Sequence, residues 1–276
     1  MKIVVTGVSG FLGRTVVRRL AGFDGTVVGV SRRALPGNIQ VVDYSDTPPG
    51  DVLIHLAETA DRAVAERAGW GYEEKALSSL RALLNRRYPR VVYASSAVLY
   101  GDRAETPRRP GDPIFEVDVY TRVKASAERS VLDSSGGLVA RLGNLFGPWM
   151  DRDNVISTIL GQIPGTGPVR VRDAHPVRDF LWVEDAADLM VRMATGAAIG
   201  VFNVGSGTAH SIGDVARVSL QVAGQDDRAV VSTEPGARSS YLVLDISGTV
   251  SMWDWAPATT LEEGIGRLLS WRRTHS

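Results

Sequence analysis

The chain has 276 residues, a length that can form one compact unit or two interleaved lobes. Its 31 basic and 31 acidic side chains balance without a long run of either sign, so the overall charge favours neither a nucleic acid nor a membrane surface as a partner. The absence of cysteine excludes disulfides, thiolate metal sites and cysteine nucleophiles and favours a cytoplasmic protein, and no apolar stretch reaches the roughly 18 residues that a membrane-spanning helix needs.

The first half of the chain alternates short apolar runs with segments of helical periodicity. We expect strands at Lys2–Thr6, Thr26–Val30, Ile39–Val42, Val52–Leu56, Arg90–Ala94 and Leu138–Leu142. Helices are expected at Phe11–Leu20, at about Ala60–Asn85 and at Tyr120–Leu132. Strands that alternate with helices at this spacing predict an α/β fold with a doubly wound parallel sheet of the Rossmann type.

The pattern becomes irregular after Gly147, and only short elements are expected before a final helix at Leu261–Trp271. We therefore predict a dinucleotide-binding domain of residues 1–147 with 173–205, and a smaller C-terminal substrate lobe of residues 148–172 with 206–276. Ligands of open α/β sheets bind outside the carboxyl ends of the strands, so this lobe is expected to cover the binding crevice.

The turn between the first strand and the first helix is rich in glycine. The expected phosphate-binding turn consists of Gly7, Ser9, Gly10, Phe11, Leu12 and Gly13. In such turns the first glycine bends the chain, the second lets backbone N–H groups approach a pyrophosphate, and the third lets the helix pack on the sheet. The same glycines can form a turn without a ligand. Their place between a strand and a helix at the start of the chain favours a dinucleotide.

The end of the second strand indicates which dinucleotide is bound. Proteins that bind NAD usually place an acidic residue here, where it accepts a hydrogen bond from the ribose 2′-hydroxyl. This chain has Ser31, Arg32 and Arg33 instead, which offer two guanidiniums to a 2′-phosphate. We therefore predict NADP(H), with a solvated basic turn as the alternative. Asp43 and Tyr44 follow the third strand and are expected near the adenine, although Asp43 can equally be an ordinary turn residue.

Tyr120 and Lys124 are candidates for proton transfer. They are four residues apart in a predicted helix and therefore lie on one face. A lysine cation stabilises a phenolate and lowers the pKa of a neighbouring tyrosine toward working pH, and it can also hold the nicotinamide ribose. A tyrosine and a lysine at this spacing are often only exposed surface residues without a catalytic role. Upstream, however, a predicted strand ends at Ser95 and Ser96, where a hydroxyl can bind a substrate carbonyl.

Further motifs extend over nearly the whole chain. They are Thr6–Gly13, His55–Ala57, Ser95–Ser96, Tyr100–Gly101, Tyr120–Lys124, Arg141–Pro148, Arg178–Asp185, Phe202–Gly207 and Leu261–Gly264. With these motifs the chain resembles the extended short-chain dehydrogenase/reductase family (NAD-dependent epimerase/dehydratase-like), in its nucleotide-sugar branch. The resemblance implies that Tyr120 is the acid/base, that Lys124 modulates it, and that Ser96, five residues before Gly101, binds the carbonyl. It also places four residues at the cofactor, namely Leu56, Ala57, Tyr120 and Lys124.

The resemblance also implies a group of substrate ligands. In the nucleotide-sugar branch an asparagine and two later arginines hold the diphosphate of the substrate, and the matching positions here are Asn144, Arg178 and Arg238. Forked cations suit a diphosphate. A surface ion pair is the alternative for each arginine, above all for Arg238. The segments Glu58–Arg62 and Ser239–Tyr241 match the nucleotide-sugar pattern poorly.

Departures from the family narrow the expected reaction. Dehydratase members carry Asp-Glu where this chain has Ala97-Val98, and bifunctional epimerase-reductases use a cysteine, which is absent here. The 4-epimerases usually carry the acid that is missing at Ser31. The resemblance therefore implies an NADPH-dependent ketoreductase of a nucleotide-linked 4-keto-6-deoxysugar.

Three alternatives stay open: reduction of a polyketide or other secondary-metabolite ketone, a nucleotide-sugar 4-epimerase, and a non-enzymatic NADP-binding sensor. Sensors of this kind generally lose the tyrosine or the lysine, and this chain keeps both. The four histidines are scattered without ligand-like spacing, so we expect no metal site. A homodimer is possible.

Overall fold

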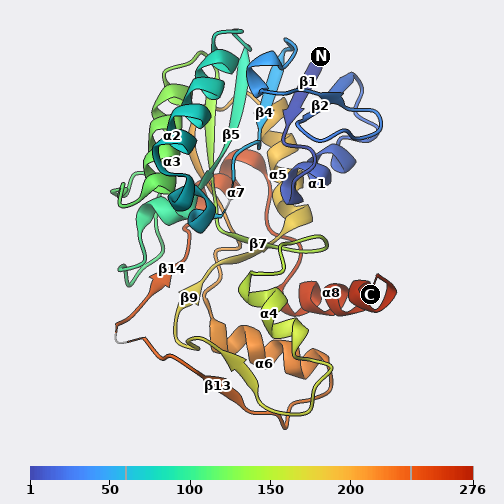
Figure 1. The fold of residues 1–276 in the computed structure, drawn as a ribbon, viewed down its shortest axis with the longest axis vertical. Coiled ribbons are helices and arrows are strands. Elements are labelled where there is room, and N and C mark those ends of the chain that lie inside the picture. The colour runs from blue at the N-terminus through green and yellow to red at the C-terminus, as the bar shows by residue number, and fades with distance from the viewer. Residues whose placement is uncertain (60, 237, 276) are drawn as a thin grey trace.

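The computed structural model describes residues 1–59, 61–236 and 238–275. A sheet of seven strands forms the centre of its larger part (Figure 1). In spatial order these are β11 (Gly200–Val204), β6 (Gly137–Leu142), β5 (Arg90–Ser96), β4 (Val52–His55), β1 (Lys2–Thr6), β2 (Thr26–Ser31) and β3 (Ile39–Gln40). Neighbouring strands run parallel throughout. The predicted Rossmann-type sheet is confirmed.

Helices cover both faces of this sheet (Figure 1). One layer contains α1 (Phe11–Arg19) and α5 (Val183–Thr195), and the other contains α2 (Arg62–Leu84) and α3 (Val119–Leu132). Two 3-10 turns, η1 (Tyr44–Asp46) and η2 (Ala97–Tyr100), follow β3 and β5. Side chains alternate between the layers: Ile3 and Val5 pack in one core and Val4 in the other. Both faces of the central strands are buried, so β1 and β4 are apolar over most of their length.

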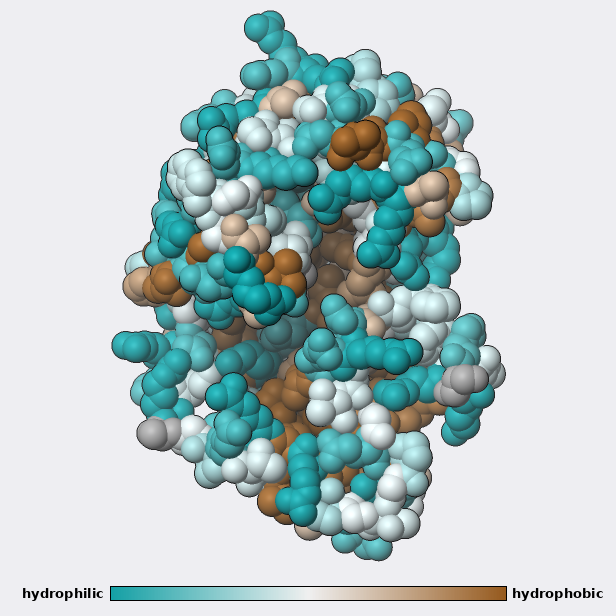
Figure 2. All heavy atoms as spheres, viewed as in Figure 1, coloured by the Kyte–Doolittle hydropathy of each residue, from teal (hydrophilic) through white to brown (hydrophobic). Residues whose placement is uncertain are grey.

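The smaller lobe lies beyond the carboxyl ends of the strands (Figure 1). Its helices are α4 (Val155–Gly161), α6 (Ile212–Val222) and α8 (Leu261–Thr274). In and beside this lobe, the strands outside the large sheet form three groups: β10 (Phe180–Trp182) with β7 (Asn144–Phe146), β13 (Val230–Ser232) with β8 (Val169–Val171), and β12 (His210–Ser211) with β9 (Val177–Arg178) and β14 (Tyr241–Leu242). Ile159, Val215 and Ile265 lie in its separate apolar core. Figure 2 shows a largely hydrophilic face that is hollowed between the two parts.

Several elements differ from the prediction. The expected helix at about 60–85 begins at Arg62 and breaks at Gly69, whose φ of 54° and ψ of −138° are not helical, while Ala60 lies outside the described residues. The third strand is only Ile39–Gln40, because it pairs at the sheet edge with β2 alone. The second half is more regular than expected: α5 buries Ala186 and Met190 at helical spacing, and a Ser211 capping box starts α6.

One segment contradicts the predicted division into lobes. Residues 206–276 were all expected in the smaller lobe, but α7 (Ser247–Trp253) contacts β11 and α5 of the larger part. Trp255 is buried in the core of the large sheet, and Trp253 packs against that core. Burial of these two large rings draws the segment back onto the sheet. For the rest of the chain the division stays a prediction. Within the described ranges no helix has both the length and the apolar character to cross a membrane.

Candidate active site

The first turn of the sheet can accommodate only glycine at two positions. Gly7 has a φ of +77°, and a Cβ there would lie 2.6 Å from the carbonyl oxygen of Leu56. A Cβ on Gly13 would lie 2.2 Å from the carbonyl oxygen of Gly7. Gly10 precedes α1 and provides no side-chain cap, so the N–H groups of Phe11 and the residue after it remain available. With the positive end of the helix dipole, they suit an anionic phosphate.

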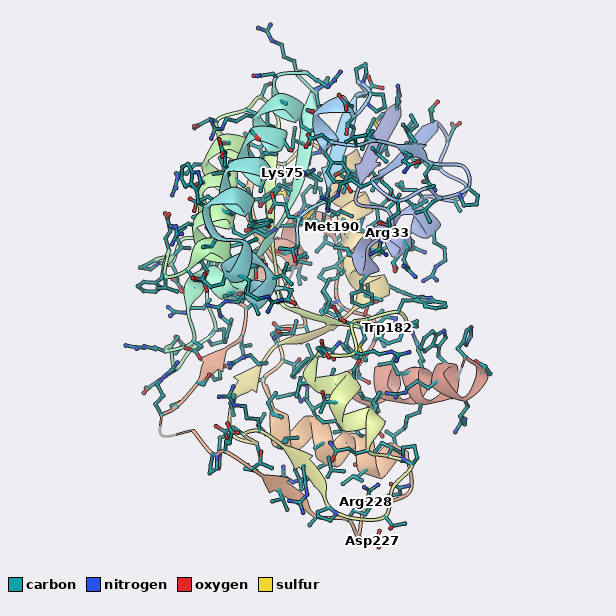
Figure 3. The ribbon with its side chains drawn as sticks, in the orientation of Figure 1. Arg33, Lys75, Trp182, Met190, Asp227 and Arg228 are labelled. Atoms are coloured by element: carbon teal, nitrogen blue, oxygen red, sulfur yellow. The ribbon has the colours of Figure 1, made fainter. Side chains whose placement is uncertain are left out.

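A cavity of about 470 Å³ lies beside this turn and is lined by Ser9, Gly10, Arg32, Arg33 and Tyr44. The structure therefore brings the glycine turn and the basic pair together. The Arg32 guanidinium lies 5.7 Å from the centre of the Tyr44 ring. The backbone N–H of Arg33 donates to the Ser31 hydroxyl at 3.0 Å. Figure 3 shows Arg33 at the end of the sheet that faces the smaller lobe. Two guanidiniums therefore border this cavity beside the glycine turn.

The other expected cofactor residues border this region. The Asp43 carboxylate accepts hydrogen bonds from the Ser45 N–H and the Ser79 hydroxyl, both at 2.9 Å. The Ser45 N–H is the main cause of a lowered pKa for Asp43. Asp43 thus also caps η1, as the turn-residue alternative requires. Leu56 and Ala57 follow β4, and their backbone closely approaches Gly7.

Helix α3 positions the proposed proton-transfer pair. A capping box between Asp118 and Thr121 starts the helix, so Tyr120 lies in its first turn and Lys124 one turn later. Both side chains are buried. The Lys124 Nζ donates to the Ala94 carbonyl of β5 at 2.8 Å and lies 5.8 Å from the centre of the Tyr120 ring. The cation is thus held beside the phenol, and the pair is not exposed on the surface.

The two serines at the end of β5 have different surroundings. The Ser95 hydroxyl is buried and donates to Glu128 at 2.5 Å, so its proton is already in use. The Ser96 oxygen accepts from the Val98 N–H at 3.3 Å, which leaves its proton for another acceptor. Of the two hydroxyls, that of Ser96 is the one able to donate to a carbonyl.

Sequence reasoning missed a buried carboxylate at this site. Glu58 Oε2 lies 2.8 Å from the Lys124 Nζ and accepts from the Tyr93 hydroxyl at 2.7 Å. Glu58 Oε1 lies 3.8 Å from the His55 Nε2. Burial alone would raise the pKa of Glu58, but attraction to Lys124 and His55, together with the hydrogen bonds from Lys124 and Tyr93, outweighs burial, and the pKa falls. Burial opposes the charge of Lys124 as well, but Glu58 raises its pKa. The available signal was an acid directly after the carboxyl end of a buried strand.

The structure brings two of the three predicted substrate ligands together. Arg178 donates to the Ser240 hydroxyl at 2.8 Å and lies 3.5 Å from Asp102, and Arg238 donates to Asp102 at 3.0 Å. Two guanidiniums thus share one carboxylate, and the cluster keeps one net positive charge. Asp102 was missed by sequence reasoning. Asn144 instead donates to the Asp179 carbonyl at 3.3 Å.

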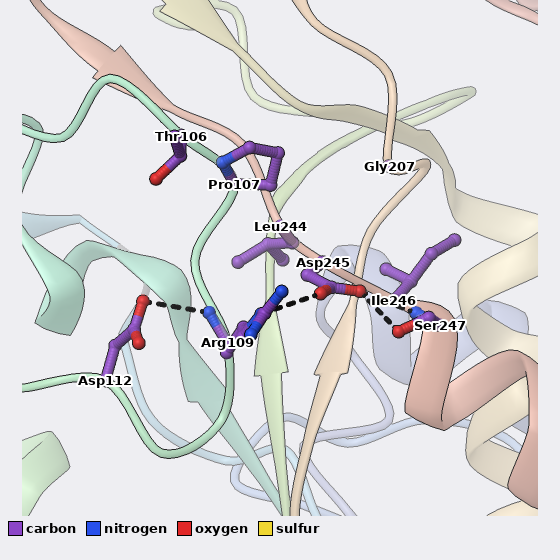
Figure 4. A pocket seen from close by; sticks show the side chains of 9 residues that line it. All are labelled: Thr106, Pro107, Arg109, Asp112, Gly207, Leu244, Asp245, Ile246 and Ser247. Carbon is purple, nitrogen blue, oxygen red and sulfur yellow. Dashed lines mark hydrogen bonds and ion pairs between the residues drawn. The ribbon is translucent and has the colours of Figure 1, made fainter.

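A larger cavity lies elsewhere. It measures about 750 Å³ and is lined by Thr106, Pro107, Arg109, Asp112, Gly207, Leu244, Asp245, Ile246 and Ser247 (Figure 4). None of these is a predicted site residue, and the Arg109–Asp245 ion pair at 3.2 Å crosses the cavity wall. Size alone therefore does not identify the site. Among the residues that the structure describes, no three His, Asp or Glu side chains are grouped as a metal site.

A Rossmann sheet with a glycine-only first turn, next to a buried tyrosine–lysine pair, defines a dinucleotide-dependent enzyme of the short-chain dehydrogenase/reductase type. The model of the NAD dependent epimerase/dehydratase family matches residues 3–205, and the chain belongs to this family. The predicted resemblance to this family is confirmed, and the protein is an NAD(P)-dependent enzyme of the family.

Individual relatives match over most of their length at low identity. The chain is 23% identical to a dTDP-6-deoxy-L-talose 4-dehydrogenase (NAD(P)(+)) of Kitasatospora kifunensis, over 97% of this chain and 94% of the relative. It is 24% identical to a dTDP-L-rhamnose 4-epimerase of Burkholderia thailandensis, over 93% of this chain and 74% of the relative. The crystal structure of the UDP-glucose 4-epimerase of Thermotoga maritima with UDP-glucose has the same fold, with a TM-score of 0.87, 21% identity and full coverage of both chains.

Proposed function

We propose that the protein is an NADPH-dependent ketoreductase that acts on a nucleotide-linked 4-keto-6-deoxysugar, with Tyr120 as the general acid. The observation that carries the proposal is the buried Tyr120–Lys124 pair at the end of β5, where Ser96 has a free hydroxyl proton. A bound nicotinamide would supply the hydride. Ser96 donates to the ketone oxygen, Tyr120 gives that oxygen a proton, and Lys124 steadies the phenolate that remains.

The arginines after β2 support NADP(H) as the coenzyme. Both line the cavity beside the glycine turn, and Ser31 presents no carboxylate that would repel a phosphate. Removing both guanidiniums (Arg32→Ala with Arg33→Ala) should weaken NADPH binding by about tenfold or more and leave NADH binding almost unchanged. Titration calorimetry with both coenzymes measures this. Equal affinity for the two coenzymes in the unmodified protein would contradict NADPH as the cofactor.

The sugar substrate is supported by two lines of reasoning. A relative that matches over nearly the whole chain is, by its name, a 4-dehydrogenase of a 6-deoxysugar nucleotide. The Arg178–Arg238 cluster keeps one net positive charge around Asp102, as a diphosphate requires. Arg178→Ala should raise KM for a keto-sugar nucleotide roughly tenfold to a hundredfold without changing NADPH affinity. Thermal protection by a hydrophobic ketone, but not by nucleoside diphosphates, would favour the polyketide alternative.

A nucleotide-sugar 4-epimerase is the second candidate. Several of the matched proteins are 4-epimerases by name. A tyrosine–lysine pair that reduces a ketone can also run in reverse, as the alcohol oxidation that begins an epimerisation. An epimerase keeps its coenzyme oxidised between turnovers, whereas a reductase consumes NADPH. Stoichiometric loss of NADPH absorbance with a keto-sugar nucleotide supports the reductase. Interconversion of 4-epimers without any added coenzyme supports the epimerase.

A further inference from the structure

The active site contains a carboxylate for which the proposed reaction has no use. The Glu58 side chain is only 6% exposed and pairs with the catalytic lysine at 2.8 Å. One oxygen also accepts the Tyr93 hydroxyl, while the other has no hydrogen-bond partner within the described residues. A buried carboxylate that is not fully hydrogen-bonded is costly, so its retention beside Lys124 calls for a role.

We propose that Glu58 is a positioning residue that neutralises Lys124 and thereby keeps Tyr120 in its protonated, proton-donating form. The inference rests on the proposed function, because it concerns the same tyrosine. A lone lysine cation next to a phenol favours the phenolate. A carboxylate in contact with that cation cancels much of its field, so the phenol keeps its proton.

The other groups around the pair do not restore a positive field. His55 from β4 is neutral at pH 7, because burial lowers its pKa to about 4. Tyr93 from β5 and Tyr72 from α2 are neutral phenols, and burial raises the pKa of both. Glu128, one turn further along α3, pairs with the Arg141 guanidinium at 2.6 Å. Lys124 and Glu58 are therefore the buried, opposed charges of this group, and Lys124 lies against the Tyr120 ring.

This arrangement matters for the direction of the reaction. Carbonyl reduction needs Tyr120 as an acid, whereas alcohol oxidation, the first half of an epimerisation, needs its phenolate as a base. By favouring the protonated phenol, Glu58 biases the site toward reduction at neutral pH. Glu58→Gln keeps the shape of the side chain and removes only its charge, so it should shift the site toward oxidation.

Tyrosinate absorbance tests the inference without any turnover. The purified protein and its Glu58→Gln variant are titrated with base, each against the same protein carrying Tyr120→Phe, and the difference isolates Tyr120. Burial raises the pKa of Tyr72, Tyr88, Tyr93 and Tyr100, so these rings ionise later. The midpoint of Tyr120 should fall by about one pH unit or more in Glu58→Gln. An unchanged midpoint overturns the inference.

Matched variants separate charge from structure. Glu73→Gln removes a carboxylate of α2 that lies 3.2 Å from Arg122, a residue on the same helix as Tyr120. This variant should leave the Tyr120 midpoint unchanged. Glu58→Met fills the site without a polar group and should give the same downward shift as Glu58→Gln, so a poorly folded glutamine variant does not end the test. A shift of the Tyr120 midpoint in Glu58→Gln and Glu58→Met, but not in Glu73→Gln, supports the inference. A shift of equal size in all three contradicts it.

Kinetics distinguish the two proposals. If the titration shifts but no ketone is reduced, the proposed function fails and the role of Glu58 stands. If NADPH reduces a keto-sugar nucleotide but the titration does not move, the role of Glu58 fails alone. If both proposals hold, the alkaline pKa in the pH profile of kcat/KM for reduction should be lower in Glu58→Gln by the same number of pH units as the titration midpoint.

Discussion

Two buried ion pairs of helix α3 lie one turn apart and differ in how fully they are hydrogen-bonded. Lys124 pairs with Glu58 at 2.8 Å, with side chains 7% and 6% exposed. Glu128 pairs with Arg141 at 2.6 Å, with side chains 3% and 6% exposed. Burial and distance are therefore nearly the same in the two pairs, so neither of them explains a difference in role.

The Glu128–Arg141 pair is saturated. The Arg141 guanidinium donates to both Glu128 oxygens and to the Pro110 carbonyl, and Ser95 donates a further hydrogen bond to the carboxylate. The guanidinium also stacks 4.8 Å from the centre of the Tyr100 ring. These contacts fasten α3 to β5 and β6. The Lys124–Glu58 pair leaves one carboxylate oxygen without a hydrogen-bond partner in the described structure and lies beside Tyr120.

From this difference in hydrogen bonding we infer that the Glu128–Arg141 pair stabilises the fold, whereas the Lys124–Glu58 pair acts in the proposed reaction. A fully bonded buried pair has no capacity left for a ligand, so it serves to fix the position of the helix. An incompletely bonded pair keeps a donor or an acceptor for the reaction. Substitutions in the two pairs should therefore change different properties of the protein.

The largest expected effect is on turnover, at the Lys124 end of the helix. Tyr120→Phe removes only the hydroxyl that we propose as the proton donor, so kcat should fall by about 10²- to 10⁴-fold while the coenzyme still binds. Steady-state kinetics and calorimetry measure the two properties. The matched control is Tyr100→Phe beside Arg141, which should keep its activity and lose stability. Full activity in Tyr120→Phe would mean that the proton comes from another group.

The second largest effect is expected on the free energy of unfolding, at the Glu128–Arg141 pair. Arg141→Met strands the Glu128 carboxylate in the core, which should lower the free energy of unfolding by about 3–5 kcal/mol. Urea denaturation followed by circular dichroism measures it. Adding Glu128→Gln removes the stranded charge and should recover much of the loss. A single variant that loses less than about 1 kcal/mol would show that the pair does not fasten the helix.

The third effect is a dependence of stability on pH at the Lys124 end. Burial lowers the pKa of His55 from 6.5 to about 4, with Lys124 adding to the shift and Glu58 opposing it. The unfolded chain therefore takes up this proton first as the pH falls. Stability present above pH 6.5 should be lost between pH 6.5 and about 4, by roughly 2–3 kcal/mol. Urea denaturation across this window should show a shallower decline for His55→Gln, and an identical decline would contradict the assignment.

The smallest effect is expected at a third pair of the same helix. Arg129 and Glu116 are 2.6 Å apart, but their side chains are 57% and 36% exposed. Water screens such a pair, so Glu116→Gln should change the free energy of unfolding by no more than about 1 kcal/mol. Urea denaturation at low and high salt measures it. A loss as large as that of Arg141→Met would show that burial is not what separates the pairs.

Features that depend on local periodicity were predicted from the sequence. The alternation of apolar runs predicted the parallel sheet, and the glycines at 7, 10 and 13 predicted its first turn. The spacing of Tyr120 and Lys124 placed them on one helix face, because the helical repeat brings residues four apart together. The break at Gly69 escaped prediction because glycine is tolerated within helices, and its backbone angles depend on the surroundings.

The sequence by itself thus determined the Rossmann sheet, the glycine turn and the candidate tyrosine and lysine, since each is set by residues only a few positions apart. Only the tertiary structure decided that Glu58 faces Lys124, that Asp102 lies between Arg178 and Arg238, and that Ser95 is engaged while Ser96 is free. The contacts of Glu58, Asp102 and Ser95 join residues between 33 and 136 positions apart. Their geometry follows from how helices dock on the sheet and how the two parts meet, and no local pattern of residues encodes that docking.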